Sequence, residues 1–284
     1  LIDYRKKITA CLPESSDFTP LMSFKLLAGM DAATVEACAA AGAAAGKYYP
    51  AGATTNAADG PSSPEMVSEA LSAMESVGIV LSIHGEDPDA PSLEREGAFL
   101  VTLEKIIERW PRLRIVLEHL STKEAVDFVA AGPERLAATI TAHHLLFTID
   151  DMMGGSLNPH LFCKPVIKSA ADRKALRNAV FSGSPKFFFG SDSAPHGRAA
   201  KESAHAPGGL YASPTVIPAL TGLFESEGVL EALRPFIAGN GAIFYGLPAP
   251  QGSLRLLRKA WRVPGEIDGA VPMCAGTELG WRLA

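Results

Sequence analysis

The chain has 284 residues, of which 47% are hydrophobic and 20% are charged. This balance supplies enough apolar side chains for a buried core and excludes a disordered tail. The formal charge of −5 and the scattered Lys and Arg residues exclude a nucleic-acid partner. No apolar run approaches the roughly 20 residues needed to span a bilayer, so we expect no membrane partner either.

The four cysteines are far apart and form no CxxC pair: Cys11, Cys38, Cys163 and Cys274. This spacing predicts reduced thiols and a cytoplasmic protein. The chain opens with Leu1 inside a polar, helix-like segment. We therefore expect that the sequence has been cut from a longer one.

Short apolar runs alternate along the chain with segments in which apolar residues recur every three or four positions. The runs predict buried strands at residues 20–25, 46–49, 79–84, 114–119, 136–141 and 186–192. The periodic segments predict helices at residues 64–78, 96–110, 174–181 and 214–224. A further helix is predicted to open at Ser121, which has the spacing of a capping box with Glu124.

Strand–helix alternation implies parallel strands, either in a doubly wound sheet or in a (β/α)8 barrel. No G-x-G-x-x-G motif follows an early strand, and polar residues stand instead at the ends of four strands: Lys47, His84, His119 and Asp192. Barrel enzymes assemble their sites at these strand ends. We therefore predict an α/β TIM barrel over residues 1–247, and an extension at residues 248–284 that packs on it.

Each of these four residues has an ordinary structural explanation when it is taken alone. An isolated His is more often structural than a ligand, the stem of Lys47 could be buried beneath an exposed ammonium, and Asp192 could cap a turn. Together, two imidazoles, an amine and a carboxylate on separate strands suit Zn²⁺.

The other histidines are weaker candidates. His143 and His144 follow the fifth predicted strand, and we expect a structural or supporting role before ligation. His160 and His205 fall in predicted loops, where a surface role is the default.

Four segments of the sequence resemble, in order and spacing, the signature segments of class II dihydroorotases. They are GKYYPAGATTN at residues 46–56, IHGE at 83–86, LEH at 117–119 and GSDSAPH at 190–196. The likeness extends from about residue 2 to the C-terminus and includes FCKP at 162–165 and VPM at 271–273. This family belongs to the amidohydrolase superfamily of binuclear-metal barrels.

The resemblance implies two Zn²⁺ ions in a complete site. Lys47 matches the carboxylated lysine that bridges them, and His84 and His119 match ligands of the second metal. Asp192 matches the carboxylate that ligates the first metal and moves the proton. A lysine must be neutral to take up CO₂, and adjacent metal charge disfavours its ammonium form.

The resemblance also assigns the substrate contacts. His196 matches a residue that binds the substrate carboxylate, helped by the backbone around Ala194, Lys164 and Gly208. Thr54 and Thr55 match the tip of a mobile loop that closes over the substrate.

The implied activity is the reversible hydrolysis of (S)-dihydroorotate to N-carbamoyl-L-aspartate in pyrimidine biosynthesis. A homodimer is the expected partner state. The family's first metal is also held by a His-x-His pair, but no two of the seven histidines here are separated by one residue. We expect that this pair and the first two βα units precede Leu1.

Two alternatives stay open: an inactive dihydroorotase-like scaffold, and another cyclic amidase of the hydantoinase or allantoinase type. The four retained strand-end residues argue against the scaffold. His196 and the Thr54–Thr55 loop argue against the other amidases, because they suit an anionic ring.

Overall fold

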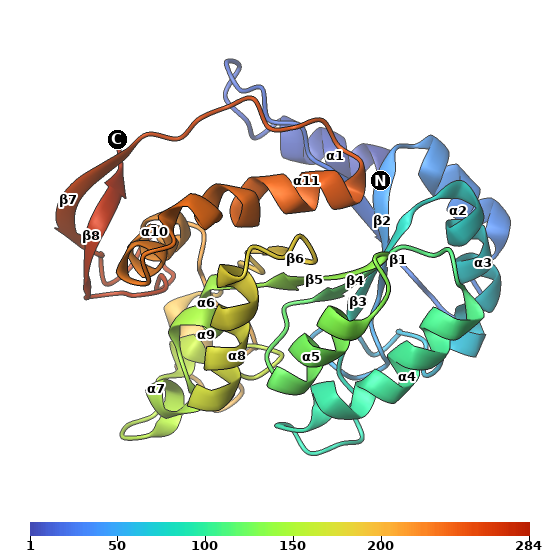
Figure 1. Cartoon of the computed structure of the whole chain (residues 1–284), viewed down its shortest axis with the longest axis horizontal. Helices are drawn as coiled ribbons and strands as arrows, with labels where there is room; N and C mark the ends of the chain where they lie inside the picture. The colour runs from blue at the N-terminus through green and yellow to red at the C-terminus, as the bar shows by residue number, and fades with distance from the viewer.

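A computed structural model describes residues 1–284 and contains a curved six-stranded sheet and a separate hairpin (Figure 1). All six strands are parallel, and each pairs with the next strand along the chain. A doubly wound sheet reverses its strand order partway, whereas a barrel does not, so the predicted barrel architecture is confirmed. The strands are β1 (Met22–Lys25), β2 (Ala43–Tyr48), β3 (Val80–His84), β4 (Ile115–Glu118), β5 (Leu136–Ile140) and β6 (Phe187–Phe189).

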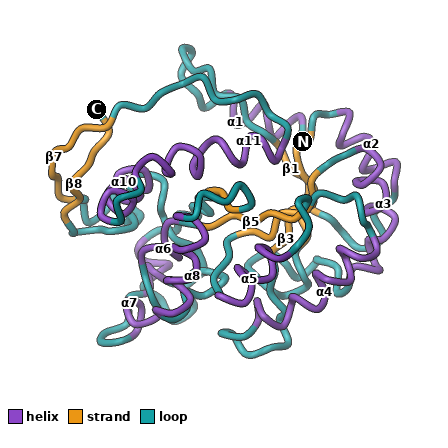
Figure 2. Tube along the Cα trace, viewed as in Figure 1, coloured by secondary structure: helices purple, strands orange, loops and turns teal.

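Helices line the outer, convex face of the sheet (Figures 1 and 2). On that face lie α2 (Ala32–Ala40), α3 (Ser68–Val77), α4 (Arg95–Arg109), α5 (Lys123–Ala131) and α8 (Ala170–Phe181). The other helical segments are α1 (Ile2–Thr9), η1 (Pro64–Val67), α6 (Ala142–Leu146), α7 (Ile149–Met153), η2 (Pro159–Leu161), α9 (Arg198–Lys201), α10 (Val216–Ser226), η3 (Leu230–Ala232), η4 (Pro235–Gly239) and α11 (Asn240–Tyr245). None of the helices has both the length and the apolar character required to cross a membrane.

Alternation along the strands separates the outer core from the barrel interior. Apolar side chains such as Leu81, Ile83 and Leu117 face outward and join the large core that includes Phe99 and Leu103 of α4. The inward-facing positions at the start of the strands form a second, smaller apolar cluster: Ala45, Val80, Val116, Ala137 and Phe188. Burial on both faces explains why these strands read as continuous apolar runs.

Helix α11 closes the interior at the start of the strands. Phe244 and Tyr245 pack against the inner cluster, with the Phe244 ring centroid 5.8 Å from that of Phe188. The Tyr245 hydroxyl lies 3.3 Å from Ser82 Oγ, and Arg114 donates a 2.8 Å hydrogen bond to the Phe244 carbonyl. The barrel interior is therefore apolar at the start of the strands and becomes polar at Ser82, toward their carboxyl ends.

Several boundaries differ from those predicted. Helix α2 was not predicted, because its run of alanines carries almost no amphipathic pattern. Strand β2 begins at Ala43 rather than residue 46, and β6 ends at Phe189 rather than residue 192. Asp192 itself could not belong to the strand, since it adopts a positive φ of 41°, which an extended strand does not allow.

The capping box predicted at Ser121 is wrong. Thr122 is the N-cap of α5, and its hydroxyl accepts a 3.2 Å hydrogen bond from the Ala125 amide. Glu96 of α4 instead accepts from the Ser121 amide at 2.9 Å and from the Thr122 amide at 2.7 Å. A carboxylate from a distant helix, invisible to local sequence rules, thus holds the segment just after His119.

Strands β7 (Leu256–Arg262) and β8 (Glu278–Leu283) form an antiparallel hairpin beyond α10 (Figure 1). Both strands lie within the extension predicted at residues 248–284. Trp281 of the hairpin donates a 2.8 Å hydrogen bond to Glu225 of α10. The division of the chain at residue 247 stays a prediction.

Glu96 predicts a specific pH dependence of stability. Its side chain is fully buried, and burial raises the pKa of the carboxyl to about 7. Because the folded pKa is raised, the stabilising contribution is full below the ordinary Glu value and is lost as pH rises through about 7. The free energy of unfolding of wild type, relative to Glu96→Gln, should fall by on the order of 2–3 kcal/mol between pH 5 and pH 8. Urea denaturation of both proteins across this range measures the difference, and a pH-independent difference would contradict the prediction.

Candidate active site

One cavity of about 250 Å³ lies at the carboxyl ends of the strands. All ten site residues predicted from the sequence line it: Lys47, Thr54, Thr55, His84, His119, Lys164, Asp192, Ala194, His196 and Gly208. Four further residues complete its wall: Tyr49, Asn56, Glu118 and Gly209. Residues separated by up to 162 positions in the sequence, from Lys47 to Gly209, therefore meet at one site, as a barrel requires.

The strand register places the polar residues side by side. Lys47 of β2 pairs with Ser82 of β3, and His84 at the end of β3 pairs with Glu118 of β4. Lys47 is 8% exposed, and its ammonium forms an ion pair with the Glu118 carboxylate. The Lys47 ammonium also lies 5.1 Å from the ring centroid of Tyr49. Glu118 thus balances the charge of the unmodified amine.

His84 and His119 form the most deeply buried part of the site. His84 Nδ1 and His119 Nε2 face each other at 3.1 Å, and the second nitrogen of His84 lies 2.8 Å from the carboxylate of Glu86. Burial, followed by the charges of His84 and Lys47, holds the pKa of His119 well below its usual value. His119 is therefore a neutral lone-pair donor at pH 7.

These residues fit a zinc ion. Two imidazole nitrogens directed at one point are normal zinc ligands, and a carboxylate on the outer nitrogen is the usual support for a metal-binding His. The outer nitrogen of His119, Nδ1, is buried and has no hydrogen-bond partner in the chain. Lys47 and Asp192 line the same cavity. The Asp192 carboxylate is chemically suited to a metal, whereas the Lys47 ammonium has no lone pair until it loses a proton.

Two site residues, His119 directly after β4 and Asp192 in the segment that follows β6, have unusual backbone conformations. His119 has a φ of 49° and Asp192 a φ of 41°. Left-handed backbone costs on the order of 1 kcal/mol or more in a residue other than glycine and is concentrated at functional sites. The His119 conformation is held in place by its amide, which donates a 2.7 Å hydrogen bond to Thr139 Oγ1 of β5.

Asp192 stands at the mouth of the cavity, where solvent reaches it although protein surrounds most of its carboxyl group. This partial desolvation raises the pKa of Asp192, and the nearby Lys47 ammonium opposes the increase. A carboxyl group in these surroundings can both accept and return a proton.

The loop that carries Thr54 and Thr55 forms one side of the cavity. Lys25 of β1 donates a 2.8 Å hydrogen bond to the Asn56 carbonyl and forms an ion pair with Asp59. From the opposite side, Lys164 reaches the Ala53 carbonyl at 3.4 Å. The loop is thus held mainly through surface-accessible side chains.

The opposite wall is a backbone surface. Gly209 has a φ of 151°, and a Cβ there would lie 2.8 Å from the Ala194 carbonyl oxygen and 2.9 Å from the His196 ring. Glycine is therefore required at position 209 for its close approach to these two residues. The wall presents His196 and main-chain groups to a ligand.

Lys201 holds this wall from behind. It is 3% exposed and donates to the carbonyls of Phe162 at 2.8 Å, Pro207 at 2.9 Å and Gly209 at 2.8 Å. Burial lowers the pKa of Lys201 to about 8. Three carbonyl acceptors from two separate segments make Lys201 a positioning residue for Lys164 and Gly208.

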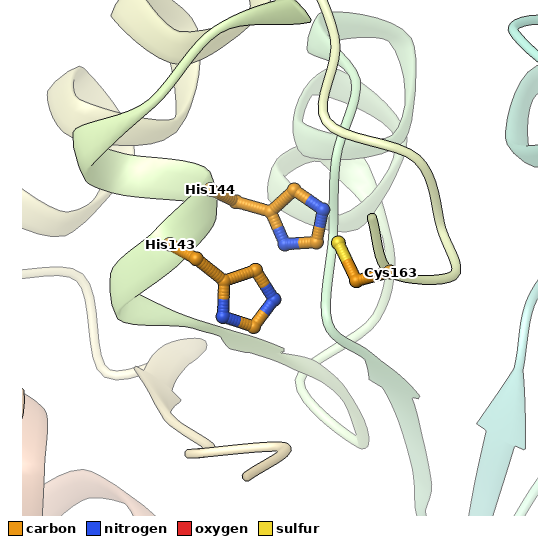
Figure 3. Close-up of side chains that lie close together, drawn as sticks. All are labelled: His143, His144 and Cys163. Carbon is orange, nitrogen blue, oxygen red and sulfur yellow. The ribbon is translucent and has the colours of Figure 1, made fainter. Parts of the chain in front are cut away.

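The remaining histidines lie outside the cavity wall. His143 and His144 are buried in α6, beside Cys163 (Figure 3). His160 is half-buried and lies 3.0 Å from Glu202, while His205 is exposed.

Sequence reasoning missed three supporting residues: Glu86, Glu118 and Lys201. Glu86 and Glu118 stand inside the quoted motifs, so their position beside a His could have indicated support. Lys201 carries no local signal, because its three acceptors are far from it in the sequence or depend on loop geometry.

The sequential parallel barrel and the Lys, His, His and Asp set at its strand ends define a metal-dependent hydrolase of the amidohydrolase type. No family model matches the chain. The chain is 42% identical over 287 residues to a dihydroorotase of Teredinibacter turnerae, covering 99% of this chain and 83% of that protein. A dihydroorotase of Erwinia tasmaniensis is 41% identical over 290 residues, with 99% and 83% covered. The chain belongs to the dihydroorotase family, and the protein is a cyclic amide hydrolase.

Solved structures of dihydroorotases give the same family assignment. Dihydroorotase of Saccharomyces cerevisiae in complex with 5-fluoroorotic acid matches with a TM-score of 0.90 and 35% identity, over 100% of this chain and 84% of that one. Dihydroorotase of Campylobacter jejuni matches with a TM-score of 0.90 and 37% identity, over 100% and 82%. An L-hydantoinase of Arthrobacter aurescens has a TM-score of 0.78 at 17% identity, over 93% of this chain and 67% of that one, and shares the fold alone.

The position of Lys201 predicts a binding defect. Lys201→Met removes all three donors, so the wall that faces the substrate should loosen while the strand-end residues stay in place. We expect KM for dihydroorotate to rise roughly tenfold with a smaller change in kcat. Lys259→Met, on the exposed face of β7, is the control and should leave both constants unchanged. An unchanged KM in a folded Lys201→Met protein would contradict the assignment.

Proposed function

We propose that this chain carries out the dihydroorotase reaction with zinc and with a carboxylated Lys47. The observation that supports the proposal is that Lys47, His84, His119 and Asp192 converge on one cavity. Lys47, once carboxylated, would bridge the two metals, with His84 and His119 on the second and Asp192 on the first. Bound zinc supplies Lewis acidity, which lowers the pKa of a water molecule and polarises the ring carbonyl.

Each remaining role follows from a residue's place in the cavity. Asp192 accepts the proton of the attacking water and returns it to the ring nitrogen as the amide bond breaks. His196 holds the substrate carboxylate, with main-chain groups around Ala194, Lys164 and Gly208. Thr54 and Thr55 cover the bound ring and exclude bulk water.

The specificity for an anionic ring follows from the wall opposite the loop. His196 and Lys164 line this wall and offer hydrogen-bond donors to an anion. A carboxylated dihydropyrimidine would pair with them, whereas a neutral hydantoin would leave them unpaired. From the family resemblance we also propose a homodimer in the cytoplasm, and a C-terminal unit at residues 248–284.

Asp192→Asn tests the proton transfer. An amide cannot accept the proton and is a weaker metal ligand, so turnover of dihydroorotate should fall by about 10²–10⁴ or more. His196→Ala should instead mainly raise KM, because it lies outside the proposed metal shell. Steady-state kinetics at saturating and limiting dihydroorotate separate the two effects.

His205→Ala is the matched control for these variants, because His205 is exposed and lies outside the cavity. It should leave kcat and KM unchanged. Near-normal turnover by Asp192→Asn would place the proton acceptor elsewhere.

His84→Ala tests the metal assignment independently of activity. We expect bound zinc to decrease by about one ion per chain after gel filtration, because a ligand with a carboxylate support is lost. Elemental analysis measures the metal content, again with His205→Ala as the control. Equal zinc in His84→Ala and wild type would overturn the ligand assignment.

A further inference from the structure

A second group of potential metal ligands lies behind the active-site wall. His143, His144 and Cys163 each offer one ligand atom, and these atoms lie within 4.8 Å of one another. Figure 3 shows the two rings of α6 and the Cys163 thiol on the same side of the helix, with the His144 ring directed at the sulfur. None of the three lines the cavity described above.

The ring nitrogens of His143 have no hydrogen-bond partner within the chain. The residue is fully buried. A buried ring nitrogen without a hydrogen-bond partner destabilises the folded chain. A metal ion bound to one nitrogen would supply the absent partner.

Hydrogen bonds at both ring nitrogens fix the orientation of His144. Its Nδ1 lies 2.8 Å from Thr141 Oγ1, which fixes the ring plane. Its Nε2 lies 3.1 Å from the Pro165 carbonyl oxygen, and Cys163 Sγ lies 3.3 Å from the same oxygen. The Pro165 carbonyl can only accept, so without a metal His144 Nε2 donates to it and Nδ1 accepts from the Thr141 hydroxyl. Metal binding would place the proton on Nδ1, which can donate to Thr141 Oγ1, and would leave the lone pair of Nε2 for the metal.

We propose that His143, His144 and Cys163 bind a divalent zinc-class metal ion, with the Pro165 carbonyl oxygen as the fourth ligand. Bonds of 2.0–2.3 Å in a tetrahedral site put the ligand atoms about 3.3–3.8 Å apart. The two distances to the Pro165 oxygen are close to this range, and the widest separation of 4.8 Å must shorten by about 1 Å. His143 can make that movement by rotating its side chain, since no hydrogen bond holds its ring.

The chemistry of the donors suits a borderline-soft ion. Two neutral imidazoles and a thiolate select zinc or cobalt over magnesium or calcium. Burial holds the pKa of His143 well below its usual value and lowers that of His144 to about 3, so both rings keep a free lone pair at neutral pH. Burial raises the pKa of the Cys163 thiol to about 12, so metal binding must release its proton to solvent.

The site would have a structural consequence for the active-site wall. Cys163 directly precedes Lys164, and Pro165 follows it. A metal that joins Cys163 and Pro165 to α6 would fix the segment that presents Lys164 to the substrate cavity. This ion is separate from the proposed catalytic pair, because it shares no ligand with Lys47, His84, His119 or Asp192.

Cobalt substitution distinguishes the two sites. The catalytic ligands are nitrogen and oxygen atoms only, so a sulfur-to-cobalt charge-transfer band can arise only from a cysteine. We expect the whole chain, loaded with Co²⁺ in place of native metal, to show this near-ultraviolet band, and the His84→Ala protein to retain it. Cys163→Ser should abolish the band and lower the bound metal by about one ion per chain.

His143→Asn and Cys11→Ser complete the test. His143→Asn keeps the thiol but removes an imidazole. The affinity for cobalt, measured by titration of the charge-transfer band, should fall by at least tenfold. Cys11 is exposed and serves as the cysteine control, with no change expected. Circular dichroism verifies that each variant is folded. A cobalt-saturated wild-type chain without the band, or a band that persists in folded Cys163→Ser, would overturn the proposal.

Discussion

The alternation of side chains along six parallel strands is the constraint on which the rest of this molecule depends. Every second residue must face the barrel interior, and the register decides which interior residues are neighbours. Here the interior is apolar at Ala45 and Val80 and becomes polar two to four residues later, at Lys47, Ser82 and His84. A slip of one residue would turn the ligands outward and bury polar groups against the helices. The same strand register is therefore required for both the apolar core and the polar site.

The polar end of the barrel needs support that the strands themselves cannot give. Parallel strands end abruptly, and the functional residues His119 and Asp192 come just afterwards with left-handed backbones. Buried charged side chains hold the following segments: Glu96 binds the amides after His119, and Lys201 binds the carbonyls around the substrate wall. Each is buried and fully hydrogen-bonded, which is the condition under which such a group can be accommodated.

The deep and the accessible parts of the site also differ in their chemistry. The deep part holds neutral nitrogen donors, His84 and His119, and the mouth holds the more accessible Asp192. The loop with Thr54 and Thr55 is attached mainly through Lys25 and Lys164, which are only partly buried. This attachment suits the closing role proposed for the loop, whereas the wall around Gly209 is fixed by a buried lysine.

The sequence by itself determined the strand order, the helical faces and the ten residues of the cavity, because buried strands and signature motifs are local patterns. The long apolar runs predicted β3, β4 and β5 closely, since burial on both faces leaves a continuous apolar signal. Helix α2 and strand β8 were missed because their local patterns are weak. Only the tertiary structure decided the true N-cap Thr122, the pairing of Lys47 with Glu118 and the three acceptors of Lys201. These contacts join residues whose proximity depends on strand register and on loop conformation. The local sequence around a single residue predicts neither of these.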